Sequence, residues 1–250
     1  MKNVKIEKAN DVPYINIYPV ADLHFGAKEC NIRKFEKHIE DICADPYGYI
    51  VLLGDMFEIA KNADEERAEH LVSSVAEILE PVADRILCIV RGNHDRNVGS
   101  YYPIAELAEK LEIPQKYVSD DAILLWLTFG DSKNHGHRAI TYSLYLTHGS
   151  GKARTEGRKI DALSSFGDNI PPADIIVCGH FHTPISMRKS VIELDEANKG
   201  FYSRDRLFVE TNAWLNYGGY AERAGMAPAS IKPPIISLNG QGKKSFNCSL

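Results

Sequence analysis

Short apolar runs alternate with helical patterns through the first half of the chain. Three runs rich in Ile, Val and Leu, each bounded by Gly, Asp or Asn, are typical of buried strands: residues 15–20, 49–53 and 86–90. Two segments between them, 31–43 and 64–80, carry apolar residues at helical spacing. This alternation of strands and helices predicts an α/β fold.

The second half of the chain is mostly strand-like. Residues 122–129 and 139–147 flank a polar loop at 130–138, which predicts an antiparallel hairpin. Further apolar runs of strand length follow at 175–178, 185–194, 206–209 and 235–238. Neither a repeat nor a linker interrupts the pattern, so we expect residues 1–250 to form a single domain.

Composition and charge narrow the class of protein. With 44% hydrophobic and 25% charged residues, the chain resembles ordinary soluble globular proteins. Its formal net charge of -5 argues against an extensive basic surface, so nucleic acid as a partner is neither indicated nor excluded. Residues 1–8 alternate charged and short apolar side chains, unlike a signal peptide or membrane span. We therefore expect a cytoplasmic protein without membrane association, and nothing in the sequence indicates an oligomeric state.

The five cysteines do not suggest a disulfide framework or a zinc ribbon. Their number is odd, and no two of them have C-x-x-C spacing. We expect them to be reduced and structural.

Five of the strand-like runs end in a cluster of residues that commonly bind metals. In chain order the clusters are Asp22-Leu23-His24, Gly54-Asp55, Gly92-Asn93-His94-Asp95, His148-Gly149 and Gly179-His180-Phe181-His182. Side chains at the ends of strands can converge on one edge of an α/β sheet. The recurrence of these clusters therefore predicts a metal centre at such an edge.

Spacing offers a reason for two of the clusters. On an extended chain, residues i and i+2 point to the same side, so Asp22 and His24 could reach one ion while Leu23 faces the core. His180 and His182 repeat this spacing.

The residue types indicate which metals would bind. Carboxylate, carboxamide and imidazole ligands suit manganese, iron or zinc better than calcium or a copper thiolate site. Two such ions ~3.5–4 Å apart can clamp a phosphoryl group, and the Asp55 carboxylate is a candidate bridge between them. We expect two divalent cations, manganese first, with iron, zinc or nickel as alternatives.

In this order the clusters resemble the pattern of the calcineurin-like metallophosphoesterase superfamily: D-x-H, G-D, G-N-H-D or G-N-H-E, a lone H, and G-H-x-H. The resemblance covers residues 22–182. It implies a four-layer α/β/β/α sandwich, in which two mixed sheets are flanked by helices. It also implies that a hydroxide bridging the two metals hydrolyses a phosphate ester.

The resemblance assigns a role to each cluster. The implied ligands of the first metal are Asp22, His24 and His182. Those of the second metal are Asn93, His148 and His180, and Asp55 would bind both. His94 would be the general acid that protonates the leaving group, and Asp95 would hold its ring.

Details of the clusters narrow the range of expected substrates. Asp95 in place of Glu, and the block Gly54-Asp55-Met56-Phe57-Glu58, differ from serine/threonine protein phosphatases. The motif style is similar to SbcD-type exonucleases and to small phosphoesterases of phages and bacteria. We expect a phosphodiester substrate, with nucleic acid or a nucleotide among the candidates. The alternatives are a phosphomonoesterase acting on a nucleotide or small metabolite, and a non-catalytic scaffold.

Some polar residues have two interpretations. The basic residues Lys152, Arg154 and Arg158 could contact a substrate phosphate or simply begin a solvated helix. Glu58 could cap a turn or stand behind the metal ligands. Residues 212–220, rich in aromatic and amide groups, could pack against the sandwich, which we favour, or line the substrate pocket.

Four further histidines lie outside these clusters and lack a partner motif. They are His38, His70, His135 and His137. We expect all four on the solvated surface.

Overall fold

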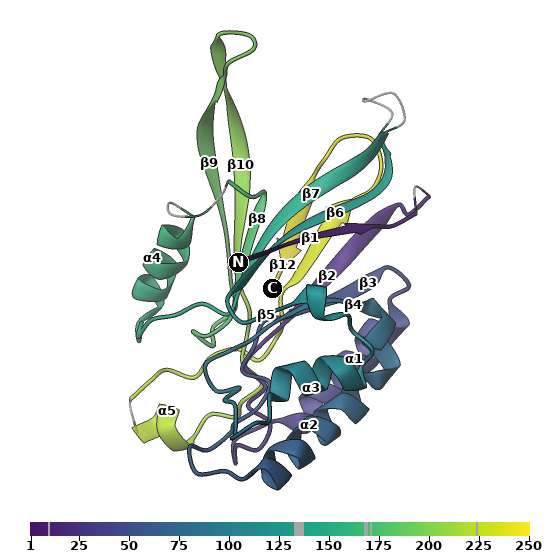
Figure 1. The fold of residues 1–250 in the computed structure, drawn as a ribbon. Coiled ribbons are helices and arrows are strands. Elements are labelled where there is room, and N and C mark those ends of the chain that lie inside the picture. The colour runs from purple at the N-terminus through teal and green to yellow at the C-terminus, as the bar shows by residue number, and fades with distance from the viewer. Residues whose placement is uncertain (10, 133–137, 168–169, 171, 224) are drawn as a thin grey trace.

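Two six-stranded sheets face each other in the computed structural model, and helices cover their outer faces (Figure 1). The structure describes every residue except 10, 133–137, 168–169, 171 and 224. Both sheets contain parallel and antiparallel pairs. The expected α/β architecture with two mixed sheets is confirmed.

The first sheet contains the strands expected in the first half of the sequence. Its spatial order is β12 (Phe246–Ser249), β11 (Ile235–Asn239), β2 (Tyr14–Val20), β3 (Gly48–Leu52), β4 (Ile86–Val90) and β5 (Val118–Ser119). The four strands from β2 to β5 run parallel, so their carboxyl ends lie on the same edge.

The second sheet contains the expected hairpin and the strands that follow it. Its spatial order is β1 (Lys2–Glu7), β6 (Ala122–Ser132), β7 (Arg138–Thr147), β8 (Ile175–Cys178), β10 (Gly200–Glu210) and β9 (Ile185–Asp195). β6 and β7 pair antiparallel, as predicted. β1 was not predicted, because only two of its six residues, Val4 and Ile6, are apolar.

The helices cover the two sheets unevenly. They are α1 (Ile32–Ala44), α2 (Glu65–Leu79), α3 (Pro103–Lys110), α4 (Glu156–Phe166) and α5 (Gly219–Arg223), with short 3-10 helices η1 (Glu80–Arg85) and η2 (Gln115–Tyr117). The first three pack on the sheet that contains β2, whereas α4 packs on the other sheet (Figure 1). The Asp64 carboxylate caps α2 by accepting from the Arg67 N–H at 2.8 Å, which explains why this predicted helix begins there.

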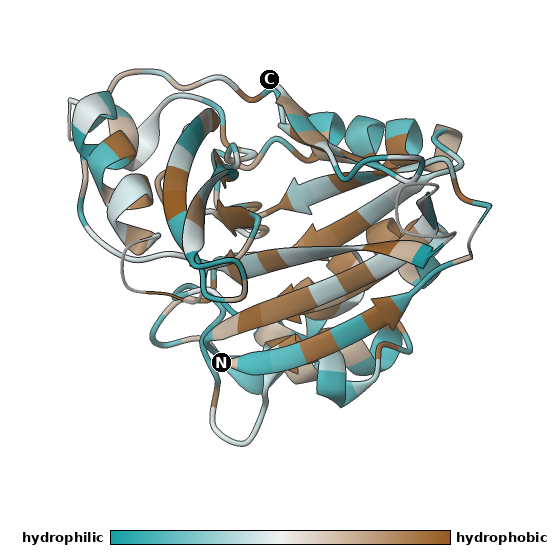
Figure 2. Cartoon of the chain, turned by 90° about the horizontal axis from the view of Figure 1, so that it is seen from above, coloured by the Kyte–Doolittle hydropathy of each residue, from teal (hydrophilic) through white to brown (hydrophobic). Residues whose placement is uncertain are grey.

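The apolar residues form three layers that match the architecture. One cluster fills the space between the sheets, one lies under α1, α2 and α3, and a smaller one lies under α4. The alternating hydrophobic and hydrophilic bands along the strands are visible in Figure 2. Within the described residues, no helix is long and apolar enough to cross a membrane.

One expected surface residue is buried. His38 on α1 is only 7% exposed, because Tyr18 and Trp214 pack against its ring at centroid distances of 5.6 and 5.0 Å. The expectation of a solvated His38 is therefore wrong, whereas His70 is exposed as expected. His135 and His137 lie outside the described residues.

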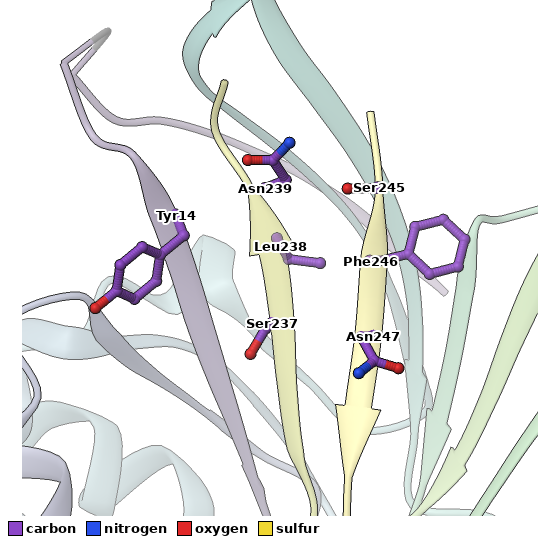
Figure 3. Close-up of a pocket in the computed structure, with 7 residues that line it drawn as sticks. All are labelled: Tyr14, Ser237, Leu238, Asn239, Ser245, Phe246 and Asn247. Carbon is purple, nitrogen blue, oxygen red and sulfur yellow. The ribbon is translucent and has the colours of Figure 1, made fainter. Parts of the chain in front are cut away.

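A surface pocket of about 250 Å³ lies between β2, β11 and β12 (Figure 3). Tyr14 lines it, at the amino-terminal end of β2. The candidate ligands follow the carboxyl-terminal end of the same strand, so this pocket is separate from them.

Candidate metal centre

The seven expected metal ligands all follow the carboxyl ends of strands. Asp22 and His24 follow β2, Asp55 follows β3, and Asn93 follows β4 in the first sheet. The remaining three follow β7 and β8 of the second sheet and are His148, His180 and His182. Side chains from both sheets therefore meet at one edge of the sandwich.

The backbone at these ligands is left-handed rather than extended. Seven described non-glycine residues have positive φ, and five of them are expected ligands: Asp22 (54°), His24 (49°), Asp55 (51°), His180 (78°) and His182 (59°). The extended-chain explanation of the D-x-H and H-x-H spacing is therefore wrong. Each such conformation costs on the order of 1–3 kcal/mol, and this kind of strain concentrates at functional sites. The residues between the ligands, Leu23 and Phe181, do face the core.

Two glycines allow the ligand loops to touch. A Cβ atom at Gly92 would lie 2.2 Å from the backbone nitrogen of Asp55. A Cβ atom at Gly179 would lie 2.7 Å from Oδ2 of Asp22. Any larger residue at either position would push a ligand loop away from its neighbour.

Asp22, His24 and His182 form the first cluster of ligand atoms. Oδ1 of Asp22 lies 3.1 Å from Nε2 of His182 and 3.8 Å from Nε2 of His24. The two imidazole Nε2 atoms are 3.3 Å apart. Oδ1 of Asp22 is buried and has no hydrogen-bond partner among the described residues. A buried carboxylate oxygen that accepts no hydrogen bond but lies among imidazole nitrogens fits a bound cation.

Asp55, His148 and His180 form the second cluster. Nε2 of His148 lies 3.2 Å from Oδ2 of Asp55 and 3.3 Å from Nδ1 of His180. Asn93 joins them, since its Oδ1 is 3.2 Å from the same Nε2. Oδ2 of Asp55 is also 3.8 Å from Nε2 of His24. The Asp55 carboxylate thus lies between the two clusters.

Hydrogen bonds fix which nitrogen of three histidines faces the clusters. Nδ1 of His148 bonds to the Leu53 carbonyl at 2.7 Å, and Nε2 of His180 bonds to the Gly151 carbonyl at 2.9 Å. Nδ1 of His24 bonds to the Glu58 carboxylate at 2.8 Å. Each ring donates one N–H to an oxygen and leaves its other nitrogen as a ligand atom, as metal-binding histidines generally do. This donor set fits a pair of divalent cations.

Glu58 also holds the expected general acid. Its second oxygen lies 2.9 Å from Nδ1 of His94, whose ring is 31% exposed and packs edge-on against His24 at 4.8 Å. One carboxylate therefore orients both a candidate ligand and the candidate acid. The interpretation that placed Glu58 behind the ligands agrees with this geometry.

Asp95 does not hold the His94 ring. Its two oxygens accept from the backbone N–H groups of Asp55, Phe57 and Gly92 at 2.8, 3.0 and 2.9 Å. The expected role for Asp95 is wrong, because its fully buried carboxylate is occupied by the loop that carries Asp55. Asp95 fixes a ligand loop, and Glu58 instead holds the His94 ring.

A comparison of the sequence with known protein families agrees with the geometry of the site. A model of the calcineurin-like phosphoesterase superfamily domain matches residues 15–197, which is more than half of the sequence. The chain belongs to the calcineurin-like phosphoesterase superfamily. It is a hydrolase that acts on phosphate ester bonds.

Solved structures similar to this phosphoesterase share little sequence with it. A conserved protein of Streptococcus pneumoniae TIGR4, described as a predicted phosphoesterase, is 12% identical with a TM-score of 0.39, covering 94% of this chain and 98% of its own. The NAD nucleotidase of Haemophilus influenzae is 12% identical with a TM-score of 0.44, over 94% of this chain and 49% of its own. Phosphopantetheinyl hydrolase of Mycobacterium tuberculosis is 10% identical with a TM-score of 0.36, over 87% and 99%. No curated protein matches the chain.

Burial and neighbouring charges set the ionisation of the phosphoesterase's candidate site. Burial opposes ionisation of Asp22, yet the imidazoles of His182, His148 and His24 outweigh it and lower the pKa of this carboxyl. Hydrogen bonds from His24 and His94 lower the pKa of Glu58. Burial disfavours the charged form of His148, but its bond to Asp55 raises the pKa to about 9. The carboxylates stay ionised at neutral pH and would attract cations.

The basic residues expected near the substrate lie on the loop after His148 and on α4. Lys152, Arg154 and Arg158 are all exposed. The same loop contacts the site, because its Gly151 carbonyl bonds to His180. The structure therefore brings the loop to the site without placing any of the three side chains on a ligand.

The segment after β10 packs against the sandwich at its beginning. Trp214 is 1% exposed, and its backbone N–H donates to the Asp22 carbonyl at 3.0 Å. Packing is therefore confirmed for Trp214, while Tyr217 further along is half exposed.

Proposed function

We propose that this phosphoesterase binds two divalent cations and hydrolyses a phosphodiester. The observation that carries the proposal is the position of Asp55, whose Oδ2 lies 3.2 Å from Nε2 of His148 and 3.8 Å from Nε2 of His24. A carboxylate between two clusters of nitrogen and oxygen donors is the arrangement that two ions share. Asp22, His24, Asp55 and His182 would hold one ion, and Asn93, His148, His180 and the same Asp55 the other.

The bound ions would supply a nucleophile at neutral pH and neutralise charge on the phosphoryl oxygens. The mixed oxygen and nitrogen donors suit manganese first, with iron, zinc or nickel as alternatives.

His94 would protonate the leaving alkoxide. Its Nδ1 is held by Glu58, so its Nε2 is free to donate a proton. The Glu58 carboxylate accepts this hydrogen bond and so keeps the orientation of the ring. The partial exposure of the His94 side chain leaves this side of the site open to a large leaving group such as a nucleotide.

Two features support a diester over a monoester. A monoester carries a second negative charge, which the basic residues Lys152, Arg154 and Arg158 would have to neutralise, and all three are exposed. In addition, a cavity of about 340 Å³ beside α4 is lined by Ser150, two residues from His148. This cavity could receive a group on the far side of the phosphate.

The proposal is tested by hydrolysis of bis-p-nitrophenyl phosphate beside p-nitrophenyl phosphate, using metal-stripped protein with manganese added back. We expect manganese-dependent hydrolysis, faster on the diester. Faster hydrolysis of the monoester would instead assign the site to a nucleotide or metabolite phosphatase. Inactivity on both, with and without manganese, would contradict a catalytic function.

A further inference from the structure

The connection that carries His180 and His182 crosses the end of another strand. β8 ends at Cys178 and β9 begins at Ile185, and both of these residues pair with Glu210, the last residue of β10. Residues 179–184 must therefore pass from one side of β10 to the other. Glu210 is therefore the strand neighbour of the residues at both ends of this connection.

The Glu210 carboxyl is buried in an unusual way. The residue is fully buried, and neither carboxyl oxygen forms a hydrogen bond of ordinary geometry with the described residues. Burial raises the pKa of Glu210 to about 9, while Lys159 opposes this shift and the N–H groups of Thr183 and Phe181 lie close enough to oppose it as well. Burying a carboxyl group with imperfect partners destabilises the fold, so a requirement other than stability has to favour it.

Lys159 approaches the same connection from α4. It lies in the first turn of that helix and its side chain is half-buried. Its Nζ donates a hydrogen bond to Oγ1 of Thr183, the residue after His182. Oγ1 of Thr183 in turn donates to the Phe181 carbonyl at 3.4 Å. The connection is thus contacted by Lys159 from α4 and flanked by Glu210 at the end of β10.

Asp95 offers a parallel within the same site. That buried carboxylate accepts three backbone N–H groups and fixes the loop that carries Asp55. Glu210 faces the N–H groups on either side of His182 from the other sheet. Each sheet therefore places one buried carboxyl group under a ligand loop.

We propose that Glu210, supported by Lys159, is a positioning residue that fixes residues 179–183 and so places His180 and His182 at the two metal positions. This inference rests on the proposed two-metal function. The left-handed backbone of both histidines, with φ of 78° and 59°, explains why such a fixing group is needed.

The test is calorimetric titration of metal-stripped protein with Mn²⁺, combined with thermal unfolding without metal. Glu210→Met removes both oxygens, whereas Glu210→Gln keeps one carbonyl acceptor. Phe208→Leu is the matched control, because Phe208 is equally buried and lies two residues earlier on the same face of β10. It belongs to the apolar cluster under α4.

We expect Glu210→Met to raise the Kd for both ions by about 10- to 100-fold, which is typical of losing a group that orients metal ligands. Without metal its melting temperature should equal or exceed that of the wild type, because a desolvated carboxyl is gone. Glu210→Gln should retain most of the affinity. Phe208→Leu should lower the melting temperature and leave the Kd within about threefold of wild type.

Other outcomes overturn the inference. A Kd for Glu210→Met equal to that of the wild type would do so while leaving the proposed function intact. Absence of Mn²⁺ binding by the wild type would instead overturn the proposed function and this inference with it. If Glu210→Met does not fold, Lys159→Met provides the same measurement from the α4 side, with a several-fold higher Kd expected and an unchanged Kd contradicting the inference.

Discussion

Replacing Glu58 with Gln should impair metal binding and proton donation together. The Glu58 carboxylate holds Nδ1 of His24 at 2.8 Å and Nδ1 of His94 at 2.9 Å. Gln keeps one acceptor and turns the other into a donor, so one of the two rings loses its partner. A hydrogen bond to a charged group contributes about 1.5–3 kcal/mol. If that energy is lost from the transition state, the rate decreases by about 10- to 150-fold.

The assay separates the two histidines. Loss of the His24 bond should raise the Kd for Mn²⁺, and saturating Mn²⁺ should correct that part of the defect. Loss of the His94 bond should remain at saturating Mn²⁺ and should be largest for aryl phosphates with poor leaving groups. Glu66→Gln, on the exposed face of α2, is the control for a lost negative charge. The reasoning is refuted if Glu58→Gln binds Mn²⁺ normally and slows all leaving groups equally.

Three further predictions concern neighbouring groups. Replacing His94 with Asn should preserve Mn²⁺ binding but slow substrates with poor leaving groups most; a uniform rate loss would count against His94 as the acid. Asp95→Asn places an amide where three backbone N–H groups need an acceptor, so it should lower the melting temperature and Mn²⁺ affinity without changing the leaving-group dependence measured by the same assay. Burial lowers the pKa of His38 to about 4, so the stability it contributes is complete above about pH 6.5 and is lost as the pH falls. By pH 4, urea unfolding of the wild type should lose about 3 kcal/mol more than His38→Phe, and equal losses would contradict a buried neutral His38.

Much of the fold follows from local sequence pattern. The strands at 15–20 and 86–90 are apolar on both faces because both faces are covered, one by the opposite sheet and the other by helices. The convergence of ligands also follows, since the carboxyl ends of parallel strands share an edge. The resemblance to the family pattern also predicts which side chains belong to which cluster.

The conformation of the ligand loops could not be predicted in the same way. Asp22 and His24 are held in the left-handed region by bonds from their N–H groups to the carbonyls of Gly54 and Asp55, at 3.0 and 2.9 Å. Those partners are far along the chain. Spacing alone suggested an extended chain, and tertiary hydrogen bonds decided otherwise.

Long-range contacts also explain the reassigned roles. Asp95 is adjacent to His94 in sequence, but the backbone of Asp55 and Phe57 occupies its carboxylate, and Glu58 reaches the ring instead. His38 lies on a polar stretch of helix and is buried by Trp214, which comes from the other end of the chain. Nothing in the sequence pointed to a role for Glu210 beyond its position at the end of a strand.

The most direct test of the central claim is the electron paramagnetic resonance spectrum of metal-stripped protein titrated with Mn²⁺. If Asp55 is shared, two Mn²⁺ ions should bind per chain, and the second should convert the six-line signal of isolated Mn²⁺ into an exchange-coupled multiline spectrum. Asp55→Ala should abolish that coupling. One bound Mn²⁺ per chain, or two ions whose signals stay uncoupled in the wild type, would contradict a shared two-metal site.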